Sequence, residues 1–179
     1  MKARRAYLDT ADSPAGKVAF AVDEAGAFIR LRFEEGDYET GMEESLESTG
    51  YILAKDPDKT AKARAELLEY AVGERKKFDT PLATTGSAWQ REVWIALTRI
   101  PFGETRTYSE VAAACGRGTS AARAVGNANA ANRLPLVVPC HRLVGSDGSL
   151  TGFAGGVHLK ERLLVHEARF AGKPSIRGG

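Results

Sequence analysis

The hydrophobic and polar positions near the start of the chain form two short patterned segments. Residues 17–22 form an apolar run after an initial lysine, and residues 27–33 alternate between apolar and charged side chains. Such runs are typical of β-strands, and the acidic, glycine-containing sequence at 23–26 is typical of a turn. We therefore predict two strands joined by this turn.

Two further segments of the first half lack this alternation. Residues 34–50 are acidic and contain glycine, which fits either a surface loop or a marginal helix. Residues 58–72 are rich in alanine, lysine, arginine, glutamate and leucine, and Gly73 follows as a helix C-terminus. Residues 1–80 are therefore predicted to form a small α+β domain.

The second half begins with a linker and two capped helices. Residues 81–86 have the composition of a connector. Ser87 is placed to N-cap a helix with an apolar stripe, which Pro101 ends. Thr107 and Glu110 have the spacing of a capping box, which predicts a second, short helix after them.

A third helix is predicted up to about Ala130, with Thr119 or Ser120 as its N-cap. The glycine-containing sequence at 116–118 separates it from the preceding helix. Two short helices around such a turn have the outline of a helix-turn-helix, although most pairs of this kind are simply packed helices. At this point both interpretations stay open.

The third helix is built mostly of alanine and glycine over residues 121–131, and Arg123 is its only long charged side chain. Small residues permit close approach to another helix or entry into the minor groove of DNA, which is about 6 Å wide. Basic residues in the surrounding sequence favour DNA. They are Arg99, Arg106, Arg117, Arg133 and Arg142.

The charge is divided unevenly between the halves. Residues 1–86 hold 13 Lys and Arg against 17 Asp and Glu, a balance of −4, whereas residues 87–179 hold 12 against 6, a balance of +6. A basic second half is compatible with an anionic partner. We expect this second domain to span residues 87–171 and the tail 172–179 to be disordered.

The composition excludes several classes of protein. Hydrophobic residues make up 43% and charged residues 27% of the 179, a globular balance, and no apolar run approaches the ~20 residues of a membrane helix. The charged start of the chain lacks the apolar run of a signal peptide, so a cytoplasmic protein is expected. Only two cysteines occur, Cys115 and Cys140, and a reducing compartment keeps both as thiols.

Cys140 stands between Pro139 and His141, after a short apolar run at 136–138 that we interpret as strand-like. An imidazole and an orienting carboxylate can activate a thiol as a nucleophile. Glu167 is the best candidate carboxylate, on a helix predicted over about 157–168 and away from the face of Lys160, Glu161 and Arg162, which we expect to be exposed. The alternative is a core thiol beside a helix-end carboxylate.

The sequence Pro139-Cys140-His141-Arg142-Leu143 resembles the active-site signature of the methylated-DNA–protein-cysteine methyltransferases. The similarity continues in order and at fixed spacing through most of residues 87–167. The matching segments are residues 89–94, 100–105, 122–128, 151–156 and 160–167.

The resemblance implies a division of roles around the cysteine. Cys140 would accept the alkyl group of O6-alkylguanine, and His141 would take the thiol proton through a water. Glu167 would orient His141 and stabilise its charge. Tyr108 would donate a hydrogen bond or a proton to the departing guanine, and Asn132 would brace the turn that carries the cysteine. The reaction would be irreversible and stoichiometric, with O4-alkylthymine as a second candidate lesion.

The resemblance also implies a double-stranded DNA partner that contains alkylated guanine, with the lesion flipped out of the helix and Arg123 filling its space. The other expected DNA-binding residues are Thr119, Ala122, Ala124, Gly126, Asn127 and Arg117. The expected pocket residues are Val138, Pro139, Phe153, Ala154, Gly155 and Gly156.

The fold implied is α+β, with a small ribonuclease-H-like domain of antiparallel sheet and helix before a mostly helical domain with a winged helix-turn-helix. We expect a monomer that needs no cofactor. No metal is expected either, because no cysteine precedes Cys115 to form the zinc site of some relatives.

Three alternatives remain at the level of sequence. A sensor of alkylated DNA that does not repair it would not need a nucleophile such as Cys140. A cysteine hydrolase would need His141 to reach Cys140, and neighbours on an extended segment point to opposite sides. A transcription factor would carry more side chains able to read base edges in the major groove than the third helix offers.

Overall fold

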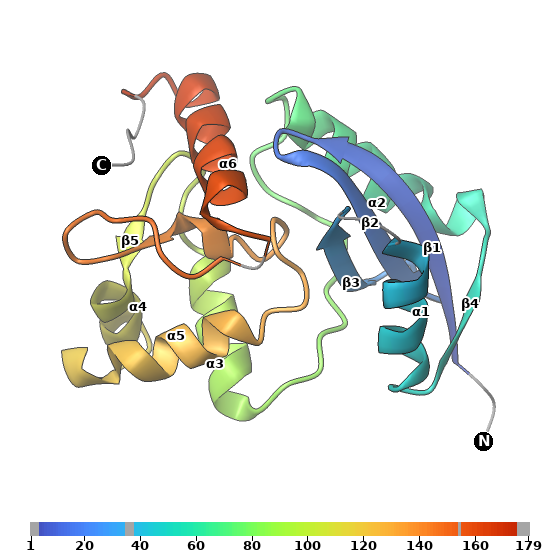
Figure 1. Cartoon of the computed structure of the whole chain (residues 1–179), viewed down its shortest axis with the longest axis horizontal. Helices are drawn as coiled ribbons and strands as arrows, with labels where there is room; N and C mark the ends of the chain where they lie inside the picture. Colours follow the sequence, from blue (N-terminus) through green and yellow to red (C-terminus); the bar gives the residue numbers. More distant parts are fainter. Residues whose placement is uncertain (1–3, 35–37, 154, 175–179) are drawn as a thin grey trace. The chain divides into compact units, whose positions relative to one another are not determined.

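Residues 1–84 and residues 85–179 form two units in the computed structural model, which describes residues 4–34, 38–153 and 155–174 (Figure 1). The first unit holds a four-stranded sheet in the order β3-β2-β1-β4. Its strands are β1 (Arg4–Ser13), β2 (Gly16–Asp23), β3 (Phe28–Phe33) and β4 (Tyr51–Ala54).

The predicted pair of strands is confirmed as β2 and β3, which pair antiparallel. The sheet as a whole is not purely antiparallel, because β4 runs parallel to β1. The sequence pattern does not predict β1, because charged and polar positions hide the period-two pattern of this strand. Ala6 and Leu8 pack on one face with Met42 and Leu46, whereas Asp9 on the other face accepts a hydrogen bond from Thr60 at 2.7 Å.

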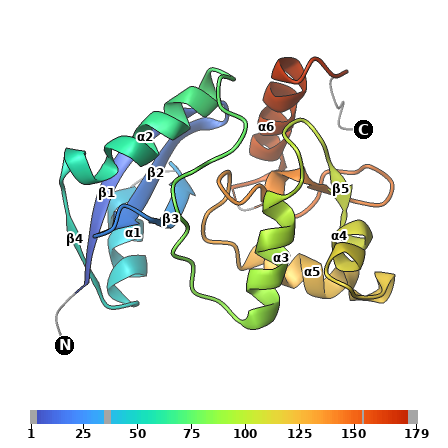
Figure 2. The ribbon, with the colours of Figure 1, turned by 180° about the vertical axis from the view of Figure 1, so that it is seen from behind.

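A helix covers each face of this sheet, as Figures 1 and 2 show from opposite sides. These helices are α1 (Tyr38–Glu47), which carries Met42 and Leu46, and α2 (Pro57–Ala71), which carries Thr60. The sequence left either a surface loop or a marginal helix open for residues 34–50, and the structure contains a helix there. Burial on both faces explains why the middle of β2 is continuously apolar.

The first two helices of the second unit begin where their predicted caps place them. Ser87 and Gln90 form a capping box at α3, and Thr107 and Glu110 form another at α4. Each box satisfies backbone N–H groups that a helix N-terminus leaves unpaired. These helices and the one that follows pack against one another: α3 (Ala88–Thr98), α4 (Tyr108–Ala114) and α5 (Ala122–Ala130).

The predicted N-caps of the third helix are wrong. Thr119 and Ser120 lie inside a 3-10 turn, η1 (Thr119–Ala121), which begins after Gly118 without a side-chain cap. The helix α5 then continues from this turn, again without a side-chain cap. Because both hydroxyl residues lie within the turn, neither occupies the position before a helix that a capping side chain needs.

The segment before the cysteine is a turn and not a strand, which corrects the expectation for residues 136–138. Leu136 has a φ of +80°, and the N–H of Val138 donates to the carbonyl oxygen of Leu134 at 2.8 Å. The following residues form a 3-10 turn, η2 (Cys140–Arg142), and continue into β6 (Leu143–Val144), which pairs in parallel with β5 (Arg106–Thr107).

The last helix, α6 (Val157–Phe170), packs against η2. It is slightly longer than the predicted 157–168. Beyond it the structure describes residues only to 174, so most of the expected tail lies outside the described residues. Within the described ranges, no helix is long and apolar enough to cross a membrane.

Candidate active site

Cys140 lies at the start of η2 and is only 4% exposed. It lines a cavity of about 700 Å³ in the second unit. Burial raises the pKa of its thiol to about 11, while a hydrogen bond with Asn132 and the charge of Lys160 act in the opposite direction. The resting side chain is therefore a thiol, and a base must remove its proton before it can act as a nucleophile.

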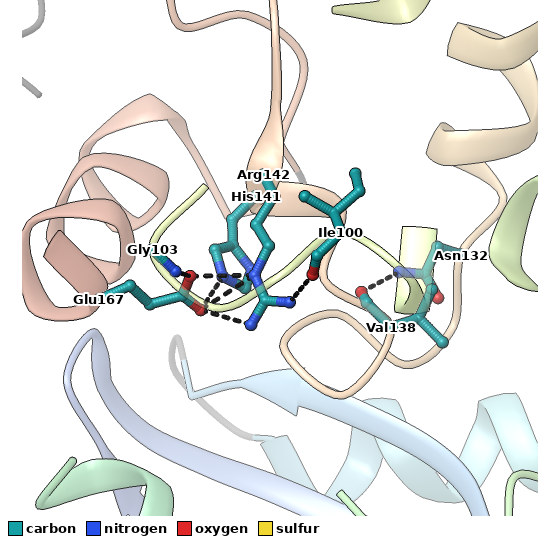
Figure 3. A network of polar contacts seen from close by, with 7 residues as sticks. All are labelled: Ile100, Gly103, Asn132, Val138, His141, Arg142 and Glu167. Carbon is teal, nitrogen blue, oxygen red and sulfur yellow. Dashed lines mark hydrogen bonds and ion pairs between the residues drawn. The ribbon is translucent and has the colours of Figure 1, made fainter. Parts of the chain in front are cut away.

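Asn132 holds the turn that leads to the cysteine. Its Nδ2 donates to the carbonyl oxygen of Val138 at 3.0 Å (Figure 3). Its Oδ1 accepts from the backbone N–H of Leu134 at 2.9 Å. Both ends of one amide are thus bonded to the two ends of the same turn. This contact stabilises the positive φ of Leu136, which a non-glycine residue rarely adopts.

His141 and Glu167 form a fully buried pair. Nε2 of His141 lies 2.7 Å from Oε1 of Glu167, and both side chains have no exposed surface. Nδ1 of His141 is buried and has no hydrogen-bond partner among the described residues. With Nε2–H donating to the carboxylate, Nδ1 carries a lone pair and can accept a proton.

Two further groups converge on the same carboxylate, as Figure 3 shows. Arg142 donates from Nε to Oε2 at 2.9 Å and from Nη2 to Oε1 at 2.9 Å, and its Nη1 donates to the carbonyl oxygen of Ile100 at 2.5 Å. The N–H of Gly103 donates to Oε2 at 2.9 Å. Arg142 is therefore buried and paired, and the expectation that it adds to a basic surface is wrong.

These contacts determine the charge states of the pair. Burial alone would raise the pKa of Glu167, but the hydrogen bonds and charges of His141 and Arg142 lower that pKa well below its usual range. Burial is also the main cause that lowers the pKa of His141, against the opposing effect of Glu167. At neutral pH the site thus holds a carboxylate and an uncharged imidazole.

Lys160 is the residue whose placement differs most from expectation. It was predicted to be exposed, but its side chain is fully buried and its Nζ donates to the carbonyl oxygen of Thr151 at 2.7 Å. Burial lowers its pKa to about 8. The sequence does contain a signal for this burial, since Lys160 precedes Leu163 and Leu164 by three and four residues, the spacing of one helix face.

The cavity brings together residues from four separate segments. Tyr108 lies at the start of α4, and its hydroxyl is 3.4 Å from the carbonyl oxygen of Thr151. Of the predicted site residues, the cavity is lined by Tyr108, Ala122, Arg123, Gly126, Asn127, Asn132, Cys140 and Phe153.

Other predicted pocket residues lie elsewhere. Val138, Pro139, Gly155 and Gly156 do not line this cavity in the described part of the chain, and Ala154 lies outside the described residues. The carbonyl of Val138 is the acceptor for Asn132, and Gly156 precedes α6 with a φ of +95°.

The predicted DNA-binding residues share a largely accessible stretch of the second unit. Ala122 and Gly126 are half-buried, and the others are exposed: Arg117, Thr119, Arg123, Ala124 and Asn127. Within the described ranges, no three His, Cys, Asp or Glu side chains are grouped so that they could hold a metal ion.

Comparison with known proteins identifies the family. The chain is 42% identical over 167 residues to the constitutive methylated-DNA–protein-cysteine methyltransferase of Bacillus subtilis, a match that covers 93% of this chain and 98% of the relative. It belongs to the methylated-DNA–protein-cysteine methyltransferase family. The family model for the DNA-binding domain of 6-O-methylguanine DNA methyltransferase matches residues 88–169, which include the entire site described above.

Further methyltransferases show the same relationship. A relative in Methanosarcina acetivorans is 39% identical over 161 residues, covering 90% of this chain and 97% of its own. The crystal structure of the Mycobacterium tuberculosis O6-methylguanine methyltransferase has a TM-score of 0.77 at 38% identity, covering 92% of this chain and 93% of its own. The M. tuberculosis protein in complex with DNA has a TM-score of 0.75 at 36% identity, covering 97% and 96%. The α+β fold is thus that of the methyltransferases.

Proposed function

We propose that this chain repairs DNA by transferring the alkyl group of O6-alkylguanine in duplex DNA irreversibly to Cys140. The observation that carries the proposal is a buried thiol at a cavity, adjacent in sequence to a buried His141–Glu167 pair. The similarity to methyltransferases over most of the chain supports the same activity. O4-alkylthymine is a second candidate lesion for the same cavity.

The chemistry we propose is a direct displacement. Sγ of Cys140 attacks the alkyl carbon, so that an S–C bond forms as the bond between that carbon and O6 breaks. The thiol proton passes through a water to Nδ1 of His141, and Glu167 stabilises the resulting imidazolium. Tyr108 donates a hydrogen bond or a proton to the departing guanine, whose negative charge must be neutralised for it to leave. The thioether product has no hydrolytic exit, so each molecule acts once and needs no cofactor.

Docking on DNA is assigned to α4 and α5, which we propose form the helix-turn-helix of a winged domain. The small residues of α5 would enter the minor groove, and Arg123 would occupy the space left by the flipped nucleotide. Binding would be mainly electrostatic and would weaken as salt increases. We also propose that the protein acts as a monomer and that the first unit is ribonuclease-H-like, which its mixed sheet covered by helices on both faces supports.

The test is the mass of the intact protein after incubation with duplex DNA that contains one O6-methylguanine. We expect a gain of one methyl group, about 14 Da, which stops at one equivalent. Cys140→Ala should abolish the gain, whereas the matched variant Cys115→Ala should retain it, because Cys115 directly follows α4 and does not line the cavity. Tight binding of the same DNA without a mass change would instead indicate a lesion sensor.

A further inference from the structure

Trp89 lies in the first turn of α3 and makes two contacts with the proposed DNA-binding segment. Its indole Nε1–H donates to the carbonyl oxygen of Ala124 at 3.1 Å, in the turn of α5 that carries Arg123. The guanidinium carbon of Arg117 lies 5.6 Å from the centre of its ring, within the range of a cation–π interaction. One side chain therefore connects the turn before α5 with α5 itself.

Trp94 makes a similar hydrogen bond deeper in the unit. Its Nε1 donates to the carbonyl oxygen of Ala128 at 2.9 Å, one helical turn farther along α5. Trp94 is only 4% exposed and belongs to the core, whereas Trp89 is half-buried. The two indoles thus attach successive turns of α5 to α3, but only Trp89 does so at the end where Arg123 and Arg117 are exposed.

This arrangement would reduce the conformational entropy that the arginine side chain loses when it becomes ordered on DNA. Arg117 is exposed, and a free arginine side chain loses rotational freedom when it contacts a phosphate. A guanidinium stacked on an indole is already restricted, while the N–H groups at its edge remain available to donate to phosphate oxygens. The hydrogen bond to Ala124 fixes the backbone next to Arg123 in the same way.

We propose that Trp89 is a positioning residue for DNA docking, which holds Arg117 in place for a backbone phosphate and fixes the turn of α5 that presents Arg123. This proposal rests on the proposed function of the chain. Trp89 does not line the cavity of Cys140, so it acts on the engagement of duplex DNA and not on the alkyl transfer itself.

The test compares two substrates for the same thiol. Single-turnover transfer to Cys140 is followed by intact mass, with O6-methylguanine either in duplex DNA below saturation or as the free nucleobase. Trp89→Phe keeps a ring for Arg117 but loses the N–H, and Trp89→Leu loses both. We expect the ratio of the duplex rate to the nucleobase rate to fall roughly threefold for Trp89→Phe and about tenfold for Trp89→Leu.

Trp94→Phe is the matched control, because it removes the same type of hydrogen bond from the core. Its effect should be a lower melting temperature, with both substrates slowed by the same factor. The proposal is overturned if Trp89→Leu also slows both substrates equally, or if it leaves the duplex rate unchanged. A melting temperature measured for each variant separates these results from a loss of folded protein.

A double-mutant cycle tests the stacking contact separately. Arg117→Gln should weaken duplex binding by about fivefold in the wild-type background and by clearly less in Trp89→Leu, because the unstacked arginine contributes less. If Arg117→Gln weakens duplex binding by the same factor in both backgrounds, the ring of Trp89 does not position Arg117. Affinity for undamaged duplex is the readout here, so the result is independent of alkyl transfer. If the wild type transferred no alkyl group, the proposed function would be contradicted. The double-mutant cycle would still test the contact between Trp89 and Arg117.

Discussion

The ammonium group of Lys160 lies 2.7 Å from the carbonyl oxygen of Thr151, and the lysine that reaches it is fully buried. Thr151 lies in the loop between β6 and α6, two residues before Phe153, and the same carbonyl oxygen is 3.4 Å from the hydroxyl of Tyr108. Lys160 thus attaches this loop to α6 while its charge acts on Cys140. The reaction depends on the shape of the cavity and on the acidity of the thiol. The side chain of Lys160 affects both.

Lys160→Met is expected to make Cys140 less reactive. Methionine is a similarly long, unbranched side chain but has no charge, so the pKa of the Cys140 thiol should rise further above 11. Alkylation of Cys140 by iodoacetamide at pH 7 should slow roughly tenfold, which corresponds to about one pKa unit. The effect should diminish above pH 8, where Lys160 itself loses its proton.

Arg162→Met is the control for this experiment, because Arg162 is exposed on the same helix. It should leave the rate of alkylation unchanged at every pH. If Lys160→Met has the same pH profile as the wild type, the charge of Lys160 does not act on the thiol.

Acid should destabilise the protein through the buried carboxylate. The pKa of Glu167 is lowered in the folded state, so the unfolded state takes up a proton first as the pH falls below about 4.5. The free energy of unfolding should therefore decrease in that range. Other carboxylates with lowered pKa values, the exposed Asp79 and the half-buried Glu104, act in the same direction.

Urea denaturation of Glu167→Gln isolates the contribution of this one group. The variant should be less stable at pH 7 by about 3–5 kcal/mol, because Arg142 loses a buried partner. Its free energy of unfolding should also depend less steeply on pH below 4.5 than that of the wild type. Parallel pH profiles for the two proteins would show that Glu167 is not the group responsible.

Asn132→Ala should release the turn before Cys140. The substitution removes both hydrogen bonds of the amide and leaves the N–H of Leu134 and the carbonyl of Val138 without that partner. A loss of about 2–3 kcal/mol of unfolding free energy is expected, measured by urea denaturation. Asn127→Ala, at an exposed position of α5, should change stability by less than about 0.5 kcal/mol.

Arg123→Ala should slow repair of duplex DNA more than reaction with free O6-methylguanine. Arg123 is exposed and lines the edge of the cavity, so its proposed role concerns the space left in the DNA and not the chemistry of Cys140. A loss of roughly tenfold or more on duplex is expected, because the cost of unstacking is no longer offset. Equal slowing of both substrates would contradict the role in filling the stack.

Gly103→Ala is expected to disturb the backbone contact between residue 103 and Glu167. Gly103 has a φ of +76°, and a Cβ there would lie 2.5 Å from the Cβ of Ala171. The backbone would have to move, and with it the N–H that donates to Glu167. Slower transfer together with a lower melting temperature would support this, and wild-type values for both would contradict it.

Local patterns were sufficient for much of the fold. The strand β2 follows from its apolar run, β3 follows from alternation, and α3 and α4 follow from their capping boxes, because these signals depend only on residues a few positions apart. The motif around Cys140 was also readable from the sequence, and so was the resemblance to the methyltransferases. The family membership of the chain confirms that resemblance.

The remaining features depend on contacts between distant segments. β1 was missed because its Asp9 faces α2 rather than solvent, and the parallel edge strand β4 is specified only by pairing with β1. Lys160 and Arg142 are charged residues that sequence patterns place at the surface. Their burial becomes favourable only when Thr151 and Glu167 supply partners that offset the loss of water.

The sequence by itself therefore determined which residues could perform chemistry, because thiol, imidazole and carboxylate are properties of single side chains. Only the tertiary structure decided how these groups are tuned. Glu167 is charged because His141 and Arg142 of η2 and the backbone of Gly103 approach it from two other segments, and the Cys140 thiol is neutral because the fold removes it from water. Electrostatic energy depends on distance and on burial, and neither is a local property of the chain.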